Sequence, residues 1–256
     1  MKKIILISLL VLANLVSYAQ ADDNPIKELS QRLLQNEMLS QRFFRDYVFI
    51  KTNNFKKKAL LDMDKSLARF DDNMNYFSSH LPQDPDVRED YEKLQGFWNV
   101  YRLRITDYDK NQYGKLIAYT KKFDELMNRF LSDMIEEHKD YSRHKKTINI
   151  AILDAENIKA IDNTASTYIL KNFLEMSEDD LFSIDFDEIK KRLKKIGKFK
   201  PVAQQTHEYI TDLYQTLNAI EKNYYKEDYN PKMMFSFVSA FSKKSYKILD
   251  IIINQI

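Results

Sequence analysis

Glycine, proline and cysteine are scarce in this chain of 256 residues, which contains 3 Gly, 5 Pro and no Cys. Average usage would give about 18 Gly. Gly-rich phosphate loops, dinucleotide fingerprints and nucleophile elbows need closely spaced glycines, so the scarcity argues against the enzymes that use them. Sandwiches, barrels and βαβ folds need many tight turns and are disfavoured for the same reason. The absence of Cys excludes disulfides, thiolate metal sites and thiol catalysis.

An excess of charge of either sign is also lacking, because 40 Lys and Arg stand against 38 Asp and Glu. Nucleic-acid-binding domains usually gather a basic surplus on one face, so we expect no nucleic-acid partner. The basic stretches at 56–58 and 190–200 are interpreted as solvated helix faces. The chain is rich in aromatic residues, with 16 Phe and 16 Tyr, which can hold helices together in a large core. Length and composition predict an all-α protein of one or two domains.

The N-terminus has the composition of a secretory signal peptide, residues 1–19. Two lysines precede an apolar run over residues 4–16, and small residues allow cleavage after Ala19 or after Ala21. The apolar run is shorter than the ~20 residues that span a bilayer. An uncleaved membrane anchor is the alternative. The pattern predicts a periplasmic or secreted protein with no transmembrane span in the mature chain.

Pro and Asn residues mark the boundaries of segments whose apolar residues recur three and four apart, which indicates helices. The expected helices cover residues 24–51, 55–80, 86–108, 115–174, 187–196, 201–225 and 231–256, with an acidic loop at 177–187. The stretch 115–174 contains no Gly and no Pro. We favour one continuous helix there over a hairpin broken near residues 138–144. The fold expected is an up-and-down four-helix bundle over 22–140 and a second, diverged bundle over 141–256, sharing that long central helix.

The first expected helix carries the run Met-Leu-Ser-Gln-Arg at residues 38–42. This run resembles the hallmark Arg-x-Arg-Met-Leu-Ser-Gln-Arg of the type IV pilus methyl-accepting chemotaxis transducer N-terminal domain family. That family is related to the periplasmic sensor region of nitrate and nitrite histidine kinases. Trp98 and Tyr101 resemble its aromatic pair. The resemblance covers roughly residues 26–140 and implies a periplasmic four-helix sensor bundle.

Gln35 and Glu37 stand at the two positions where the family motif has Arg. In the nitrate sensors the Arg just before the Met meets the anion, so the resemblance implies that Glu37 would oppose nitrate or another small oxyanion there. The family often carries the unit in tandem, and residues 155–173 lie where a second copy would begin, but the motif does not recur there. The resemblance therefore implies the fold and not the ligand.

Polar residues lie on the apolar face of this first helix. Asn36 and Ser40 are centred on that face, while Glu37 and Arg32 lie toward its edges and Gln41 follows Ser40 in the motif. A buried polar group without a partner costs ~1–3 kcal/mol. We favour internal hydrogen bonds that fix the helix register. The alternative is a small ligand pocket lined by these five residues.

The opposite side of the same helix carries a thinner stripe, formed by Met38, Arg42 and Phe49. One hypothesis is that a partner helix packs there and makes the chain a homodimer. An equally acceptable interpretation is a surface Arg42 paired with Asp46, one helical turn further on.

Patterns for catalysis and metal binding are weak. The four His are scattered, no Glu-x-x-His pair occurs, and the acidic loop at 177–187 lacks the Gly and the alternating ligands of an EF-hand. We therefore expect no enzyme, no metal and no cofactor. Two functions fit. The chain is either an exported ligand-binding or sensor module, without an output domain of its own, that acts through an envelope signalling partner, or a structural helical protein of the cell envelope that binds no small ligand.

Overall fold

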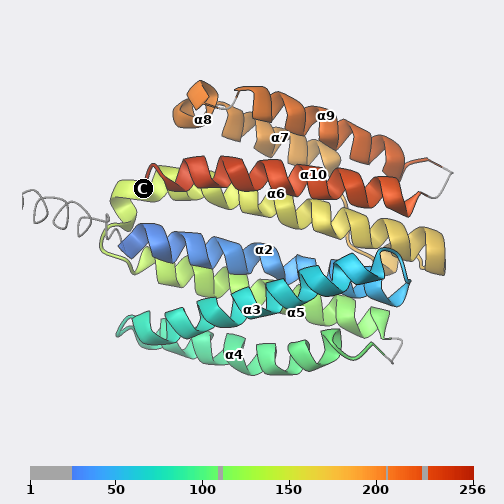
Figure 1. Cartoon of the computed structure of the whole chain (residues 1–256). Coiled ribbons are helices and arrows are strands. Elements are labelled where there is room, and N and C mark those ends of the chain that lie inside the picture. Colours follow the sequence, from blue (N-terminus) through green and yellow to red (C-terminus); the bar gives the residue numbers. More distant parts are fainter. Residues whose placement is uncertain (1–24, 109–111, 206, 227–229) are drawn as a thin grey trace, which may run out of the picture.

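A computed structural model describes residues 25–108, 112–205, 207–226 and 230–256, so the expected signal peptide lies outside the described residues. The described part contains nine α-helices, one 3₁₀ helix and no strand, which confirms the all-α prediction (Figure 1). In chain order the elements are α2 (Pro25–Lys51), α3 (Lys56–His80), α4 (Pro85–Ile105), α5 (Tyr113–Glu136), α6 (Tyr141–Leu174), η1 (Glu178–Asp180), α7 (Phe186–Gly197), α8 (Lys200–Gln205), α9 (His207–Tyr224) and α10 (Pro231–Ile253).

Side chains that accept hydrogen bonds from free backbone N–H groups begin several of these helices. Asp84 accepts from the N–H of Asp86 at 2.8 Å at the start of α4. Asp185 accepts from the N–H of Glu188 at 2.8 Å, and so caps α7. Asn230 caps α10 through its side-chain oxygen, directly before Pro231. The boundaries of these helices follow from local chemistry.

The prediction of one continuous helix over residues 115–174 is wrong. Helix α5 ends at Glu136 and α6 begins at Tyr141. Between them the N–H of Tyr141 donates to the carbonyl of His138 at 2.8 Å, and the N–H of Asp140 donates to Nδ1 of His138 at 3.2 Å. These bonds close a turn that contains neither Gly nor Pro, so the alternative of a hairpin broken near residues 138–144 is the one observed.

Helix α2 lies at the centre of the molecule. It packs against α3 and α5 on one side and against α6 on the other, and it also touches α10 (Figure 1). Helix α4 packs on α5, α6 packs on α7 and α10, and α9 packs on both α7 and α10. Because α2 is enclosed from several directions, most of its residues are buried, including many polar ones.

Helices α2 and α6 run parallel, whereas α3, α5 and α10 run antiparallel to α2 (Figure 1). Glu37 contacts Lys159, and Arg45, two turns further along α2, contacts Asp162, further along α6. In contrast, Phe49 contacts Phe235 whereas the earlier Arg42 contacts the later Tyr246. The interface between α2 and α6 thus joins the first half of the chain to the second.

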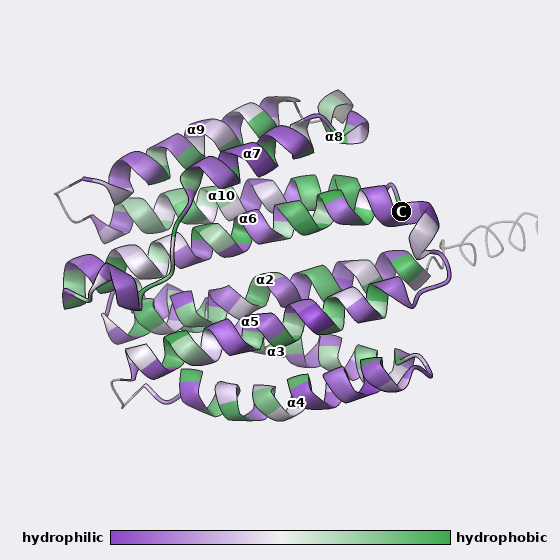
Figure 2. Cartoon of the chain, turned by 180° about the vertical axis from the view of Figure 1, so that it is seen from behind, coloured by the Kyte–Doolittle hydropathy of each residue, from purple (hydrophilic) through white to green (hydrophobic). Residues whose placement is uncertain are grey.

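Every labelled helix carries both hydrophilic and hydrophobic residues (Figure 2). The apolar positions form a continuous core, in which Phe43, Phe70, Trp98 and Phe123 make one ring cluster with centroids 4.3–5.8 Å apart. Within the described ranges, each helix is too short or too polar to cross a membrane.

Candidate functional site

The Met-Leu-Ser-Gln-Arg motif on α2 faces the interior of the protein. Asn36, Glu37, Ser40 and Gln41 are all buried. The Ser40 hydroxyl lies 2.8 Å from a carboxylate oxygen of Asp124 on α5 and 2.8 Å from the Glu37 carbonyl. The side-chain oxygen of Asn36 accepts from Asn73 on α3 at 2.7 Å. The structure therefore surrounds these predicted site residues with protein groups.

Lys159 of α6 completes the network around Ser40. Its ammonium lies 3.1 Å from Glu37 and 2.7 Å from Asp124. Burial raises the pKa of Glu37, although Lys159 opposes this effect. Burial lowers the pKa of Lys159, but Glu37 and Asp124 outweigh it and raise the pKa above its ordinary value. A charged Lys159 thus holds α2, α5 and α6 together, as expected if the motif sets the register of these helices.

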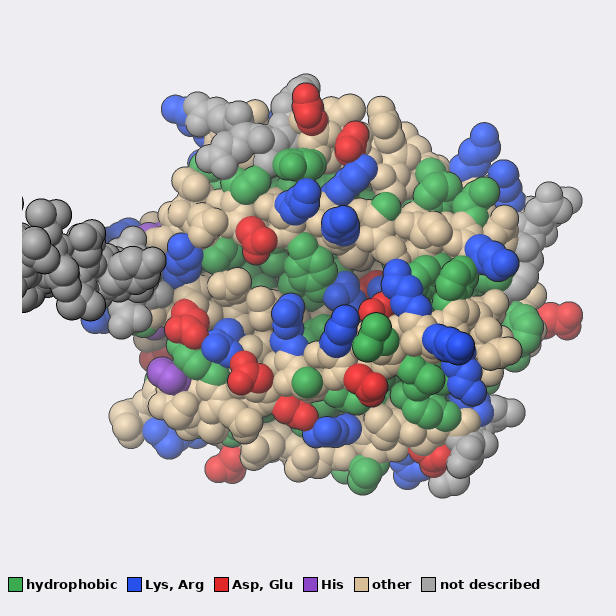
Figure 3. Space-filling view, in the orientation of Figure 1, with side chains coloured by type: hydrophobic (Ala, Val, Ile, Leu, Met, Phe, Trp, Pro, Cys, Tyr) green, Lys and Arg blue, Asp and Glu red, His purple; other side chains and the backbone are tan. Residues whose placement is uncertain are grey.

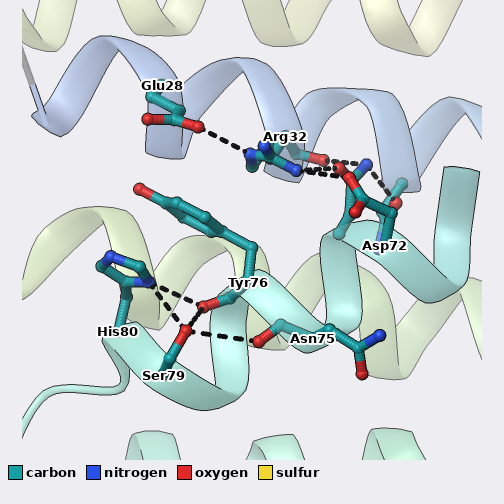
Figure 4. A network of polar contacts seen from close by, with 9 residues as sticks. Glu28, Arg32, Asp72, Asn75, Tyr76, Ser79 and His80 are labelled. Atoms are coloured by element: carbon teal, nitrogen blue, oxygen red, sulfur yellow. Dashed lines mark hydrogen bonds and ion pairs between the residues drawn. The ribbon is translucent and has the colours of Figure 1, made fainter.

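Arg32, the fifth predicted pocket residue, lies near the surface, apart from that network. Its guanidinium bonds Glu28 at 3.0 Å on α2 and Asp72 at 2.9 Å on α3 (Figure 4). The ring of Tyr76 lies beneath it, with the centroid 4.5 Å from the guanidinium carbon, and His80 stacks on Tyr76 at 4.0 Å. Arg32 therefore ties α2 to α3 rather than facing the buried Ser40.

The stripe expected to contact a partner is covered by α6 and α10 of the same chain. Met38 and Phe49 are fully buried, and Phe49 packs edge-to-face on Phe235 at 5.0 Å. Arg42 donates to Asp162 at 3.3 Å and to the Tyr246 hydroxyl at 2.7 Å. The predicted homodimer contact through these residues is therefore wrong, because the second half of the chain occupies that face.

The alternative pairing of Arg42 with Asp46 is wrong as well. Arg45 bonds Asp46, with Nε 2.9 Å from a carboxylate oxygen, and its Nη1 lies 2.6 Å from Asp162. Burial raises the pKa of Asp46 to about 6, although Arg45 opposes it. Two arginines and two aspartates, Arg42, Arg45, Asp46 and Asp162, thus form a charge-balanced cluster between α2 and α6.

An open groove of about 640 Å³ lies next to this cluster, with α3 and α10 as its walls and α2 as its floor. The lining residues are Gln35, Leu39, Arg42, Arg45, Lys58, Asp62, Lys65, Ser66, Ala68, Arg69, Ser239, Ser242, Lys243 and Tyr246. Six of these are Lys or Arg and one is Asp. Lys and Arg side chains gather around the hollow between α10 and α3 on the face seen in Figure 3. The volume falls within the ~300–1,000 Å³ typical of small-molecule sites.

The wall cations of this groove lack counter-ions. Within the described ranges, no ion pair is made by any of the four cations on the groove walls: Lys58, Lys65, Arg69 and Lys243. In contrast, the ammonium of Lys244, the next residue on α10, lies 3.0 Å from the Asp212 carboxylate. Lys58 instead lies over the ring of Phe235, 4.8 Å from its centroid. The interpretation of the 56–58 stretch as a solvated face therefore misses the groove.

One hydroxyl group of the groove lining, that of Ser242, also lacks a hydrogen-bond partner in the described part of the chain. Ser242 is 6% exposed. Serines within helices of this protein commonly bond a carbonyl three or four residues earlier, as Ser40 and Ser166 do. A buried hydroxyl without a partner costs ~1–3 kcal/mol. Ser242 is therefore a donor and acceptor that a bound molecule could satisfy.

Catalytic and metal-binding geometry is not seen at this groove. No group of three or more His, Asp or Glu that could hold a metal ion occurs among the described residues. His80 stacks on Tyr76 and His138 bonds the turn before α6, so neither lines the groove. The chemistry that the lining offers is hydrogen bonding and positive charge.

The sequence does not predict the groove, because the groove is lined by three helices, α2, α3 and α10, from distant parts of the chain. One signal was present in α3, where Lys58, Lys65 and Arg69 are spaced by seven and four residues and so share a face. No family model matches the chain, and no curated protein or solved structure shows significant similarity to it.

Proposed function

We propose that the chain is an exported, non-catalytic helical module that binds a small ligand in the groove between α3 and α10 and acts through a partner protein. In this proposal the helices form two four-helix units, α2–α5 and α6, α7, α9 and α10, joined through α2 and α6. The resemblance of residues 38–42 to the pilus chemotaxis sensor domain supports a sensory role, with its motif fixing helix register instead of binding the ligand.

The observation that carries this proposal is the buried, unbonded Ser242 hydroxyl in a groove whose wall cations are also unpaired. Ser30 is also buried without a partner in the described part of the chain. Ser242 differs from it because it lines the groove among unpaired cations, where a ligand would supply a partner. The groove walls belong to different units, because α3 lies in the first and α10 in the second. A molecule bound to both walls would favour one relative placement of the units, which is a means of passing a signal to a partner.

The alternative is a structural protein of the cell envelope that binds no small molecule. Val100 and Leu103 favour it, since they lie one turn apart on α4 and are 46% and 72% exposed. Exposed apolar side chains on one helix face are typical of protein contacts, although two residues make a small patch.

A thermal-shift screen with a matched pair of variants tests the ligand-binding proposal. Ser239→Trp places an indole in the groove, whereas Ser236→Trp places one on the exposed side of the same helix. We expect at least one compound from a set of neutral, cationic and anionic metabolites to raise the melting temperature of the wild type and of Ser236→Trp, but not of Ser239→Trp. A screen in which no compound raises the wild-type melting temperature would favour the structural alternative.

A further inference from the structure

We infer that the ligand of this groove is an organic anion with at least two negatively charged groups, either carboxylates or phosphates. This inference rests on the proposed ligand-binding function of the groove and deepens it. The lining holds six cations and one carboxylate, Asp62. Two of the cations, Arg42 and Arg45, are balanced by Asp46 and Asp162. The four wall cations therefore set the charge that a ligand meets.

The two walls of the groove are in register, which shows where this charge is concentrated. Lys58 on α3 lies against Phe235 on α10, and both helices run antiparallel to α2 and hence parallel to each other. Advancing seven residues along each helix, by about 10 Å, brings Lys65 level with Ser242. Arg69 and Lys243 lie within one turn of this level, so the two walls carry three unpaired cations around the unbonded Ser242 hydroxyl.

Arg42 supplies a fixed donor at the floor of this cationic end. Its Nε bonds Asp162 and its Nη1 bonds the Tyr246 hydroxyl. Its Nη2 makes no hydrogen bond within the described part of the chain, and the residue lines the groove. A guanidinium held by two bonds loses little freedom when it binds an anion, which favours carboxylate or phosphate recognition.

The dimensions of the groove favour a ligand with more than one charged group. Lys58 and Arg69 are eleven residues apart on α3 and thus about 16 Å apart along the helix. A single oxyanion would meet one end and leave Lys58 alone at the other. The floor includes Leu39 and the α3 wall includes Ala68, both near the Arg69 end. An organic body with charged groups therefore complements the lining.

The alternative for these lysines and arginines is simple solvation, which is usual for exposed cations. Three features distinguish them from an ordinary charged surface: they line a concave groove, they come from two walls, and they surround a buried hydroxyl without a partner. An acidic ligand would meet the cations of both walls at once and would also supply a partner for the Ser242 hydroxyl.

Calorimetric titration of the wild-type chain with citrate, pyrophosphate and inorganic phosphate tests the inference. Citrate represents a multivalent carboxylate and pyrophosphate a multivalent phosphate. We expect at least one of these two to bind with a dissociation constant of about 1 mM or below, and inorganic phosphate to bind about tenfold more weakly. The affinity should fall as sodium chloride is added, because salt screens exposed charges.

Variants locate the binding on the groove. Arg69→Gln and Lys243→Gln should each weaken binding about tenfold, the effect of losing one charge-assisted contact. Lys232→Gln removes an exposed charge at the start of the same helix as Lys243 and should leave the affinity unchanged. An equal loss in Lys232→Gln would overturn the inference, because it would show nonspecific attraction to net charge. Unchanged urea-unfolding midpoints establish that the variants are folded.

Failure of the inference is distinguishable from failure of the proposed function. If neither citrate nor pyrophosphate binds at about 10 mM, the inference is overturned. A neutral or cationic compound that stabilises the wild type and Ser236→Trp but not Ser239→Trp would then show that the groove binds a ligand of another class. If no compound stabilises the wild type, both the inference and the proposed function fail.

Discussion

The ammonium nitrogen of Lys159 lies 3.1 Å from Oε1 of Glu37, a residue 122 positions earlier in the chain. Both side chains are almost fully enclosed, and Asp124 from a third helix approaches the same ammonium at 2.7 Å. Removal of one partner from a buried ion pair leaves an uncompensated charge, which is costlier than removal of the whole pair.

We expect Lys159→Met to lower the free energy of unfolding by about 3–5 kcal/mol. Adding Glu37→Gln to this variant should restore part of the loss, because one of the two carboxylates left unpaired is then neutral. Urea unfolding followed by circular dichroism measures both effects. Lys146→Met, on the exposed side of the same helix, serves as the control and should change little. A loss in Lys159→Met no greater than in this control would refute the role of the network.

Ser40 and Ser30 form a matched pair on α2, since both are fully buried. The Ser40 hydroxyl bonds the Asp124 carboxylate, whereas the Ser30 hydroxyl has no partner in the described part. We expect Ser40→Ala to cost about 1.5–3 kcal/mol, the contribution of a hydrogen bond to a charged group. Ser30→Ala should be neutral or stabilising. Equal unfolding midpoints for the two variants would show that the Ser40 hydroxyl stabilises the protein no more than the Ser30 hydroxyl does.

Asp154 on α6 predicts a pH dependence of stability. Its side chain is fully buried, and burial raises its pKa from 3.8 to about 8, against a smaller opposing effect of the Ser245 hydroxyl. The unfolded chain releases this proton near pH 4 and the folded chain near pH 8. The contribution of Asp154 to the free energy of unfolding is therefore greatest below about pH 4, falls as the pH rises from about 4 to about 8, and is constant above that.

The variant Asp154→Asn isolates this effect. Each unit of pKa difference corresponds to about 1.4 kcal/mol, so the advantage of the variant over the wild type should grow by several kcal/mol between about pH 4 and pH 8. Other buried carboxylates, such as Asp46, are common to both proteins and cancel in the comparison. Urea unfolding at a series of pH values measures the difference, and a difference that stays constant with pH would contradict the prediction.

Gly96 lies in the interior of α4, and a Cβ added there would meet no atom within 4 Å beyond its chain neighbours and its own helix backbone. Glycine in a helix interior costs about 1 kcal/mol relative to alanine, so Gly96→Ala should raise the free energy of unfolding by about this amount. At Gly197 the same Cβ would lie 3.2 Å from Ile210. Gly197→Ala should therefore stabilise less or destabilise, and thermal unfolding of the two variants compares them directly.

The helical class and most helix boundaries can be predicted from the amino-acid sequence, because they depend on local chemistry. Scarce Gly and Pro left long helices, while Asp185 capped α7 and Asn230 capped α10 as single side chains can. The buried position of Asn36 and Ser40 followed from the helical period alone. The break at residues 137–140 was only the less favoured alternative, because the turn is closed by His138 and backbone bonds rather than by Gly or Pro.

The neighbours of α2 and the position of the groove depend on tertiary packing and are not predicted from the sequence. The sequence shows that Arg42 and Phe49 share a helix face, but not that Tyr246 and Phe235 of the same chain cover it in place of a second copy. The groove exists because α10 returns beside α2 and leaves a gap to α3. Helical periodicity specifies the face that a residue occupies, whereas the neighbour of that face depends on how distant segments pack.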